Sequence, residues 1–262
     1  MNPLAEKYFR KSALPTIFCP GCGDGTVLHA MLRVIEKTGL ENYAFVSGIG
    51  CSGWIPVYIN TDVIHALHGR AIPVATGLAL SMPDKKIVVF TGDGDCCGIG
   101  GNHLIHAARR NIDMTVVMIN NYIYGMTGGQ VSPSPPAGSK TKTSPYGNPE
   151  RPFDAAALVQ AAGAAFVARE TAVAPLRLEK SLSAAIRHQG FSFMEVITQC
   201  PTQAGRNIFG DGKPQTIYHA LKKAAVSQKD VPLESGQFRV GILHADLASP
   251  PYRPPLASAR PI

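Results

Sequence analysis

Apolar runs typical of strands alternate along the chain with segments of helical periodicity. Residues 26–37 place Val27, Met31, Val34 and Ile35 on one helix face. We expect strands at residues 43–47, 86–91, 114–119, 164–168 and 191–198, and further helices at 71–82, 101–110, 153–162, 173–189 and 216–227. Continuous apolar strands separated by helices are typical of a parallel sheet covered on both faces. The pattern therefore predicts an α/β fold with a mostly parallel sheet.

Two segments depart from this alternation. From residue 125 to 152 the composition changes to Gly, Ser, Thr and Pro, and a loop of that length is usually functional or disordered. Because the alternation resumes at residue 153, we expect residues 1–262 to form a single domain with a long internal loop. The tail at 250–262 is rich in proline and is expected to be extended rather than helical.

Composition and charge narrow the function classes. With 45% hydrophobic and 16% charged residues the chain is not intrinsically disordered as a whole. The net charge of +7 favours an anionic partner, which includes nucleic acid, an anionic cofactor and an acidic protein. There is no apolar stretch long enough to span a membrane and no signal peptide pattern, so we expect a cytoplasmic protein without membrane contact.

Six cysteines stand out in such a chain, because cytoplasmic thiols stay reduced and are used for metal or redox chemistry more than for disulfides. Cys19 and Cys22 have the spacing of a metal knuckle, and Cys200 precedes a proline. Together with Cys51 these thiols fit either a zinc ion or an iron–sulfur cluster, and cysteines alone do not separate the two. Cys96 and Cys97 are expected to be small buried side chains.

An acidic turn follows the strand predicted at 86–91. Asp93 stands between two glycines at the carboxyl end of that strand, where open α/β sheets bind ligands. Taken alone, this is an ordinary turn. Asn120 and Asn121 follow the next strand, however, and supply a second oxygen ligand. Carboxylate, amide, carbonyl and diphosphate oxygens together suit Mg²⁺.

Several motifs follow one another in a fixed order, and the order is more specific than any one of them. They are Cys19-Pro-Gly-Cys22-Gly, Gly48-Ile-Gly-Cys51-Ser, His65-Ala-Leu-His68-Gly-Arg, Gly92-Asp-Gly-Asp95, Asn121-Tyr-Ile-Tyr-Gly-Met-Thr, Gly129-Gln-Val-Ser-Pro and Cys200-Pro201. Over most of residues 18–201 the chain resembles the beta subunit of 2-oxoacid:ferredoxin oxidoreductases, which bind thiamine diphosphate. The resemblance implies a thiamine diphosphate-binding fold.

The resemblance also implies roles for individual residues. Mg²⁺ would be held by the side chains of Asp93 and Asn121 and by the carbonyl of Ile123. The thiamine diphosphate would be lined by Ile49, Gly50, Cys51, Ser52, His68, Gly94, Asp95, Gly125 and Met126. A [4Fe-4S] cluster would be held by Cys19, Cys22, Cys51 and Cys200. Cys51 would then stand beside the reacting carbon, where zinc has no redox chemistry to offer.

Five histidines lie in or near these motifs and helices, at positions 29, 65, 68, 103 and 106. His68 belongs to the matched motif, so we expect it to contact phosphate or substrate, as a candidate catalytic residue. His65 is expected to be structural. His29, His103 and His106 are expected to be packing or surface residues.

The activity implied is the reversible oxidative decarboxylation of 2-oxoglutarate with coenzyme A to succinyl-CoA and CO₂, with electrons passing to ferredoxin. Pyruvate is the alternative substrate. The glutamate that activates the cofactor would come from an alpha subunit, in a heterodimer or a dimer of heterodimers. The exposed-loop candidates Lys140, Lys142 and Arg151 lie in residues 128–151, which either cover the cofactor, contact an acidic ferredoxin or form a solvated linker.

Two other function classes remain open at this stage. A thiamine-dependent decarboxylase or synthase without electron transfer would not need the four cysteines. A zinc-bearing nucleic-acid binder would suit the basic charge, but the basic residues are scattered and no nucleic-acid recognition motif is present. We therefore expect no nucleic-acid partner.

Overall fold

The computed structural model describes residues 3–227 and 230–253. Its helices are α1 Pro3–Tyr8, α2 Gly23–Thr38, α3 Ala71–Ser81, α4 Gly101–Arg109, α5 Ala155–Ala161, α6 Pro175–Arg187 and α7 Pro214–Ala224. Its strands are β1 Tyr43–Ser47, β2 Val63–His65, β3 Lys86–Gly92, β4 Met114–Asn120, β5 Ile123–Tyr124, β6 Gln130–Val131, β7 Phe166–Thr171, β8 Phe191–Ile197, β9 Ala225–Val226, β10 Phe238–Arg239 and β11 Gly241–Ala245.

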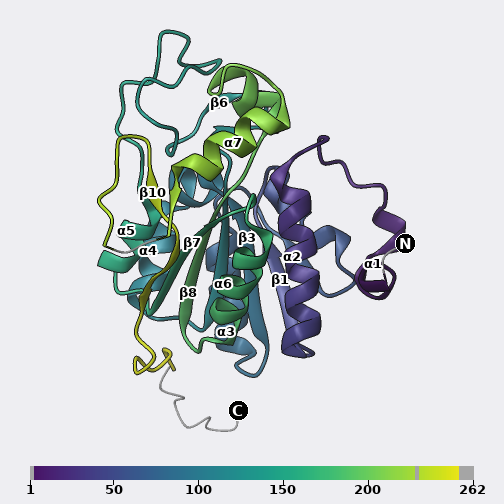
Figure 1. The fold of residues 1–262 in the computed structure, drawn as a ribbon. Coiled ribbons are helices and arrows are strands. Elements are labelled where there is room, and N and C mark those ends of the chain that lie inside the picture. The colour runs from purple at the N-terminus through teal and green to yellow at the C-terminus, as the bar shows by residue number, and fades with distance from the viewer. Residues whose placement is uncertain (1–2, 228–229, 254–262) are drawn as a thin grey trace, which may run out of the picture.

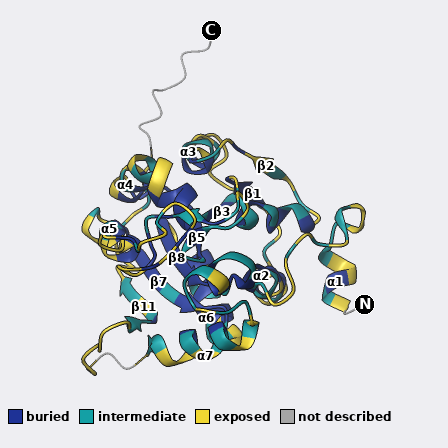
Figure 2. Ribbon diagram, turned by 90° about the horizontal axis from the view of Figure 1, so that it is seen from above, coloured by how far each residue is buried: buried dark blue, intermediate teal, exposed yellow. Residues whose placement is uncertain are grey.

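Seven strands form one sheet in the order β11-β7-β8-β4-β3-β1-β2. All neighbours run parallel except β11, which is antiparallel to β7. Helices α2 and α6 cover one face, and α3, α4 and α5 cover the other (Figures 1 and 2). The expected α/β fold with a mostly parallel sheet and helices on both faces is confirmed.

Strand β3 shows why the strands read as continuous apolar runs. Val88 and Phe90 point into the core beneath α2 and α6, whereas Ile87 and Val89 point into the core beneath α3 to α5. Successive side chains of a strand alternate between faces, and here both faces are buried. An apolar residue is therefore needed at each of these positions.

The expected strand 164–168 is displaced, since β7 runs from Phe166 to Thr171. It continues through two charged residues that the hydrophobic pattern does not recognise. Both are paired: Arg169 Nε lies 2.6 Å from Glu195 Oε2, and Glu170 Oε2 lies 3.0 Å from an Arg177 guanidinium nitrogen. Pairing offsets part of the cost of burying these charges in a strand.

Other differences concern short elements. The expected loop 125–152 contains β6, which pairs antiparallel with β5, and the edge strands β2 and β11 were not expected. Helix α7 ends at Ala224 and is followed by β9, so the expected helix 216–227 is too long. Short, half-exposed strands depend on their neighbours more than on their own pattern.

Residues 250–253 of the expected extended tail contain no helix or strand, and 254–262 lie outside the described residues. The single-domain organisation of residues 1–262 stays a prediction. Among the residues that the structure describes, every helix is too short or too polar to cross a bilayer.

Candidate active site

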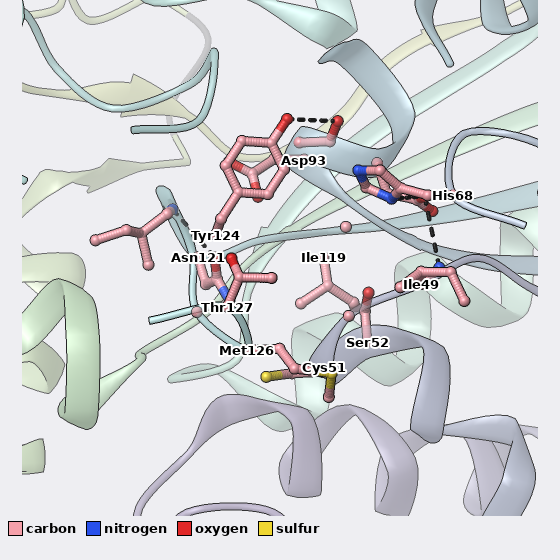
Figure 3. A pocket seen from close by; sticks show the side chains of 16 residues that line it. Ile49, Cys51, Ser52, His68, Asp93, Ile119, Asn121, Tyr124, Met126 and Thr127 are labelled. Carbon is pink, nitrogen blue, oxygen red and sulfur yellow. Dashed lines mark hydrogen bonds and ion pairs between the residues drawn. The ribbon is translucent and has the colours of Figure 1, made fainter. Parts of the chain in front are cut away.

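The candidate site is a cavity of about 210 Å³ at the carboxyl ends of β1, β3 and β4 (Figure 3). The chain leaves β1 toward β2 and leaves β3 toward β4 on the other side. The crevice between β1 and β3 is therefore a topological switch point, where open α/β sheets bind ligands. The lining residues are Ile49, Gly50, Cys51, Ser52, His68, Gly92, Asp93, Gly94, Asp95, Ile119, Asn121, Ile123, Tyr124, Gly125, Met126 and Thr127.

Asp95 connects three loops of this cavity. Its Oδ1 accepts a hydrogen bond of 2.6 Å from the Gly69 N–H, and its Oδ2 accepts one of 2.6 Å from Thr91 Oγ1. A side chain at Gly48 would place its Cβ 1.7 Å from Asp95 Oδ2. The loop after β1 can approach Asp95 only because residue 48 has no side chain.

We expect Gly48→Ala to destabilise the chain by about 1–3 kcal/mol, because the new Cβ must displace Asp95 or the loop. Urea unfolding followed by circular dichroism measures the change. Gly77→Ala is the matched control, since Gly77 lies in α3 with open space around its Cβ position. Alanine there should stabilise by about 0.5–1 kcal/mol. Equal stability of the two variants would contradict the steric argument.

His68 and Tyr124 face each other across the cavity (Figure 3), with ring centroids 6.1 Å apart. His68 Nδ1 lies 2.6 Å from Asp95 Oδ1, close enough for an ion pair when the imidazole is protonated. Nδ1 makes no hydrogen bond of good geometry to a described residue. Tyr124 donates a hydrogen bond of 3.1 Å to the Gly94 carbonyl, and burial raises the pKa of its phenol.

The oxygen ligands expected for Mg²⁺ lie together in the cavity wall. Asp93 is buried, and burial raises the pKa of its carboxyl to about 6 although two serine hydroxyls, Ser132 and Ser134, pull it down. Asn121 Oδ1 accepts a hydrogen bond of 3.2 Å from the Ile123 N–H. Carboxylate, amide and carbonyl oxygens from these residues form a donor set that suits Mg²⁺.

All four cysteines expected to hold a cluster line a second cavity, of about 230 Å³. The two cavities share Cys51, Asn121, Gly125 and Met126. A Cβ on Gly125 would lie 3.6 Å from Cys200 Sγ and 3.8 Å from Cys51 Sγ, so Gly125 marks the border between the two cavities. The structure thus brings the four cysteines next to the residues expected to line the thiamine diphosphate.

Burial dominates the protonation of the cysteine group. It raises the pKa of Cys51 to about 12 and raises those of Cys22 and Cys200 as well. A bound cation would favour the thiolate form of these three side chains. Within the described residues no three His, Cys, Asp or Glu side chains come close enough to hold a single metal ion.

Comparison with known proteins identifies the family. Residues 48–196 match the family described as thiamine pyrophosphate enzymes, C-terminal TPP binding domain; thiamine pyrophosphate is thiamine diphosphate. The chain is 57% identical over 202 residues to the 2-oxoglutarate synthase subunit KorB of Methanothermobacter thermautotrophicus, covering 76% of this chain and 71% of that protein. It is 51% identical to the KorB of Methanocaldococcus jannaschii, covering 86% of this chain and 84% of that protein.

A solved structure agrees. The 2-oxoglutarate:ferredoxin oxidoreductase from Magnetococcus marinus, with 2-oxoglutarate, coenzyme A and succinyl-CoA bound, matches with a TM-score of 0.84 and 32% identity, over 95% of this chain and 87% of that one. The chain belongs to the beta subunits of the 2-oxoacid:ferredoxin oxidoreductases. The family resemblance seen in the motifs is thereby confirmed, and with it the thiamine diphosphate-binding fold.

In this beta subunit, several residues at the site were not singled out by their sequence pattern. Ser132 stands in the Gly129-Gln-Val-Ser-Pro motif, which was matched without a role for its serine. Ser134 and Thr91 have no motif signal. Asp24 is fully buried beside Cys22, and burial raises the pKa of its carboxyl to about 7. A polar residue next to a motif carries no pattern of its own, so only the contacts reveal these positions.

The remaining cysteines and histidines lie outside both cavities. Cys96 and Cys97 are buried as expected, and Cys97 Sγ lies 3.5 Å from Met118 Sδ. His65 Nδ1 lies 2.7 Å from Ser47 Oγ, which fits the structural role expected of it. His29 packs on the Phe9 ring at 5.7 Å. His103 and His106 lie on α4, away from the cavity lining.

Proposed function

We propose that this beta subunit binds thiamine diphosphate and Mg²⁺ in the first cavity and a [4Fe-4S] cluster in the second, and that with an alpha subunit it converts 2-oxoglutarate and coenzyme A to succinyl-CoA and CO₂. The observation that carries the proposal is the shared border of the two cavities, at Cys51, Asn121, Gly125 and Met126. Oxidative decarboxylation needs the carbon that loses CO₂ to lie next to the group that accepts its electrons.

Asp93, Asn121 and the Ile123 carbonyl would hold Mg²⁺, and the glycine loops after β1 and β3 would present backbone N–H groups to a diphosphate. When bound, thiamine diphosphate supplies the electron sink that a decarboxylating 2-oxoacid needs. Asp95 holds the His68 loop through the Gly69 N–H. We propose that His68 contacts the phosphate or the substrate, since its half-buried ring lines the cavity.

Cys19, Cys22, Cys51 and Cys200 would hold the cluster, which when bound takes up electrons one at a time. Cys19 is exposed while Cys200 is buried, so the cysteine cavity reaches from the thiamine site to the surface. We propose a ferredoxin as the electron acceptor. The exposed cations Lys140, Lys142 and Arg151 of the long loop would favour such an acidic partner.

That loop is not a solvated linker, because part of it packs against the site. Ser132 and Ser134 are buried at Asp93, and Asn148 and Thr141 are buried as well. A packed loop can present its basic side chains in a defined arrangement. This supports its proposed role at the cofactor and at the ferredoxin surface.

Three features support an alpha subunit at the cavity mouth. In the described part of the chain no glutamate lines the cavity, and the cavity is smaller than the roughly 300–1,000 Å³ of complete ligand sites. Two apolar side chains at the cavity are exposed. Met126, in its wall, is 45% exposed, and Leu67, which precedes the lining residue His68, is 77% exposed. An alpha subunit docked at the cavity mouth would cover these side chains. We propose a heterodimer or a dimer of heterodimers.

We place the protein in the cytoplasm, because its six free cysteines fit a reducing compartment. All six cysteines lie in the described residues and are free, which argues against a structural disulfide. Neither the cavities nor the scattered basic residues support nucleic-acid binding.

The test is to reconstitute the alpha–beta complex without oxygen and measure steady-state rates on 2-oxoglutarate, pyruvate and 2-oxobutyrate with coenzyme A and ferredoxin. We expect kcat/KM for 2-oxoglutarate to exceed the others by at least about tenfold, a difference of about 1.4 kcal/mol. The isolated beta subunit should release no CO₂ from any of them. Preference for pyruvate would replace the substrate assignment, and robust activity of the isolated chain would refute the two-subunit proposal.

A further inference from the structure

Two serine hydroxyls of the long loop bind one oxygen of Asp93. Ser132 Oγ donates to Asp93 Oδ2 at 2.5 Å, and Ser134 Oγ donates to the same oxygen. The serines are 3% and 6% exposed, so water does not compete with them. Because both bonds end on Oδ2, they set the rotation of the carboxylate about its Cβ–Cγ bond.

A third polar side chain decides where the Ser134 proton goes. Ser134 Oγ also lies 2.8 Å from Asn120 Oδ1, which already accepts a hydrogen bond of 3.1 Å from the Tyr122 N–H. A serine hydroxyl has one proton to donate. Asn120 Oδ1 already accepts a hydrogen bond, and the Asp93 carboxylate is the charged acceptor. The Ser134 hydroxyl is therefore best oriented to donate its hydrogen bond to the carboxylate.

The orientation of the Asn120 amide is itself determined by a buried ion pair. Asn120 Nδ2 donates to Glu195 Oε1 at 2.8 Å, and Glu195 Oε2 accepts from Arg169 Nε at 2.6 Å. Turning the amide over would bring its oxygen against a carboxylate. Arg169 also lies 2.5 Å from Asp154, which caps the N-terminus of α5. The network therefore reaches from a helix cap to Asp93.

We propose that Ser132 and Ser134 are positioning residues of the Mg²⁺ site, which hold the Asp93 carboxylate in the orientation that binds the cation, and that Arg169, Glu195 and Asn120 hold Ser134 in place. This makes the long loop a part of the metal site rather than only its cover. The inference rests on the proposed function, because it takes Asp93 as a Mg²⁺ ligand.

The experiment uses the full alpha–beta complex carrying Ser132→Ala, Ser134→Ala or both. After removal of metal with EDTA, Mg²⁺ is added at a fixed concentration of thiamine diphosphate, and binding is followed by quenching of protein fluorescence. Changes to groups behind a metal ligand cost about 10–100-fold in metal affinity. We expect each single variant to need about tenfold more Mg²⁺ for half-saturation, the double variant up to about 100-fold more, and all to regain turnover at saturating Mg²⁺.

Ser139→Ala is the matched control, because Ser139 is a buried serine of the same loop that makes no hydrogen bond to Asp93. It should need the wild-type Mg²⁺ concentration. If Ser134→Ala does not fold, Ser132→Ala carries the test alone, since Ser132 makes its own hydrogen bond to Oδ2. Half-saturation of the double variant within about twofold of wild type would overturn the inference. A wild-type complex whose thiamine diphosphate binding needs no Mg²⁺ would instead refute the proposed metal site, and the inference with it.

Discussion

Cys200→Ser is expected to remove the proposed [4Fe-4S] cluster and to abolish the proposed reduction of ferredoxin. Cys200 is 7% exposed and lines the cysteine cavity next to Cys51 and Gly125. A serine hydroxyl does not replace a buried thiolate as an iron ligand, so the loss should exceed the about 10–100-fold that changes behind a ligand cost. Iron content, the broad absorbance near 400 nm typical of iron–sulfur clusters and the rate of ferredoxin reduction measure it, all under anaerobic conditions.

Cys97→Ser serves as the control. Cys97 is also buried, but it packs on Met118 and lies outside both cavities. The Cys97→Ser protein should keep the absorbance near 400 nm and the full iron content. A Cys200→Ser protein with unchanged iron would exclude Cys200 as a ligand. A colourless wild-type protein with stoichiometric zinc would replace the cluster by a zinc site.

Asp93→Asn is expected to eliminate Mg²⁺-dependent binding of thiamine diphosphate and to lower kcat/KM by about a thousandfold. The substitution preserves the shape of the side chain and an acceptor for Ser132 and Ser134, while removing the negative charge that a divalent cation needs. A cation acting on a reacting or phosphoryl oxygen is worth several kcal/mol, which corresponds to about this factor. Calorimetric titration of the complex with thiamine diphosphate, with and without Mg²⁺, measures the binding directly.

Asp113→Asn is the matched control, because Asp113 precedes β4 at the opposite end of the sheet, where it accepts a hydrogen bond of 3.1 Å from the Gly190 N–H. That variant should bind thiamine diphosphate as the wild type does. Wild-type binding by Asp93→Asn would show that the cation is held elsewhere, and the oxygen ligands proposed here would then be wrong.

The chain order of the motifs predicts much of this site, and the reason is the geometry of a parallel sheet. Asp93 and Asn121 follow neighbouring strands, and the carboxyl ends of parallel strands meet at one edge. The nine side chains and backbone positions expected to line the cofactor therefore line one cavity. Likewise, Cys19 and Cys200, 181 positions apart, share a cavity because Cys19 precedes α2, which begins at this edge, and Cys200 follows β8, which ends there.

Polar positions within strands were harder to interpret. Arg169 and Glu195 break the apolar runs of β7 and β8, and the pattern alone placed the end of β7 too early. Their charges are tolerated because the pairing of β7 with β8 brings Arg169 Nε within 2.6 Å of Glu195 Oε2. A pairing between different strands has no local signal, since it depends on their register.

Sequence by itself determined the α/β class, the positions of the buried strands along the chain and the family, because hydrophobic periodicity and motif spacing are local properties of the chain. The family resemblance selected Asn121, which lines the cavity, but only the tertiary structure showed that Asn120 is held by Glu195 and contacts Ser134. The tertiary structure alone placed Ser132 and Ser134 on Asp93. Side chains that act through contacts between distant segments have no periodicity, so their roles emerge only once the chain is folded.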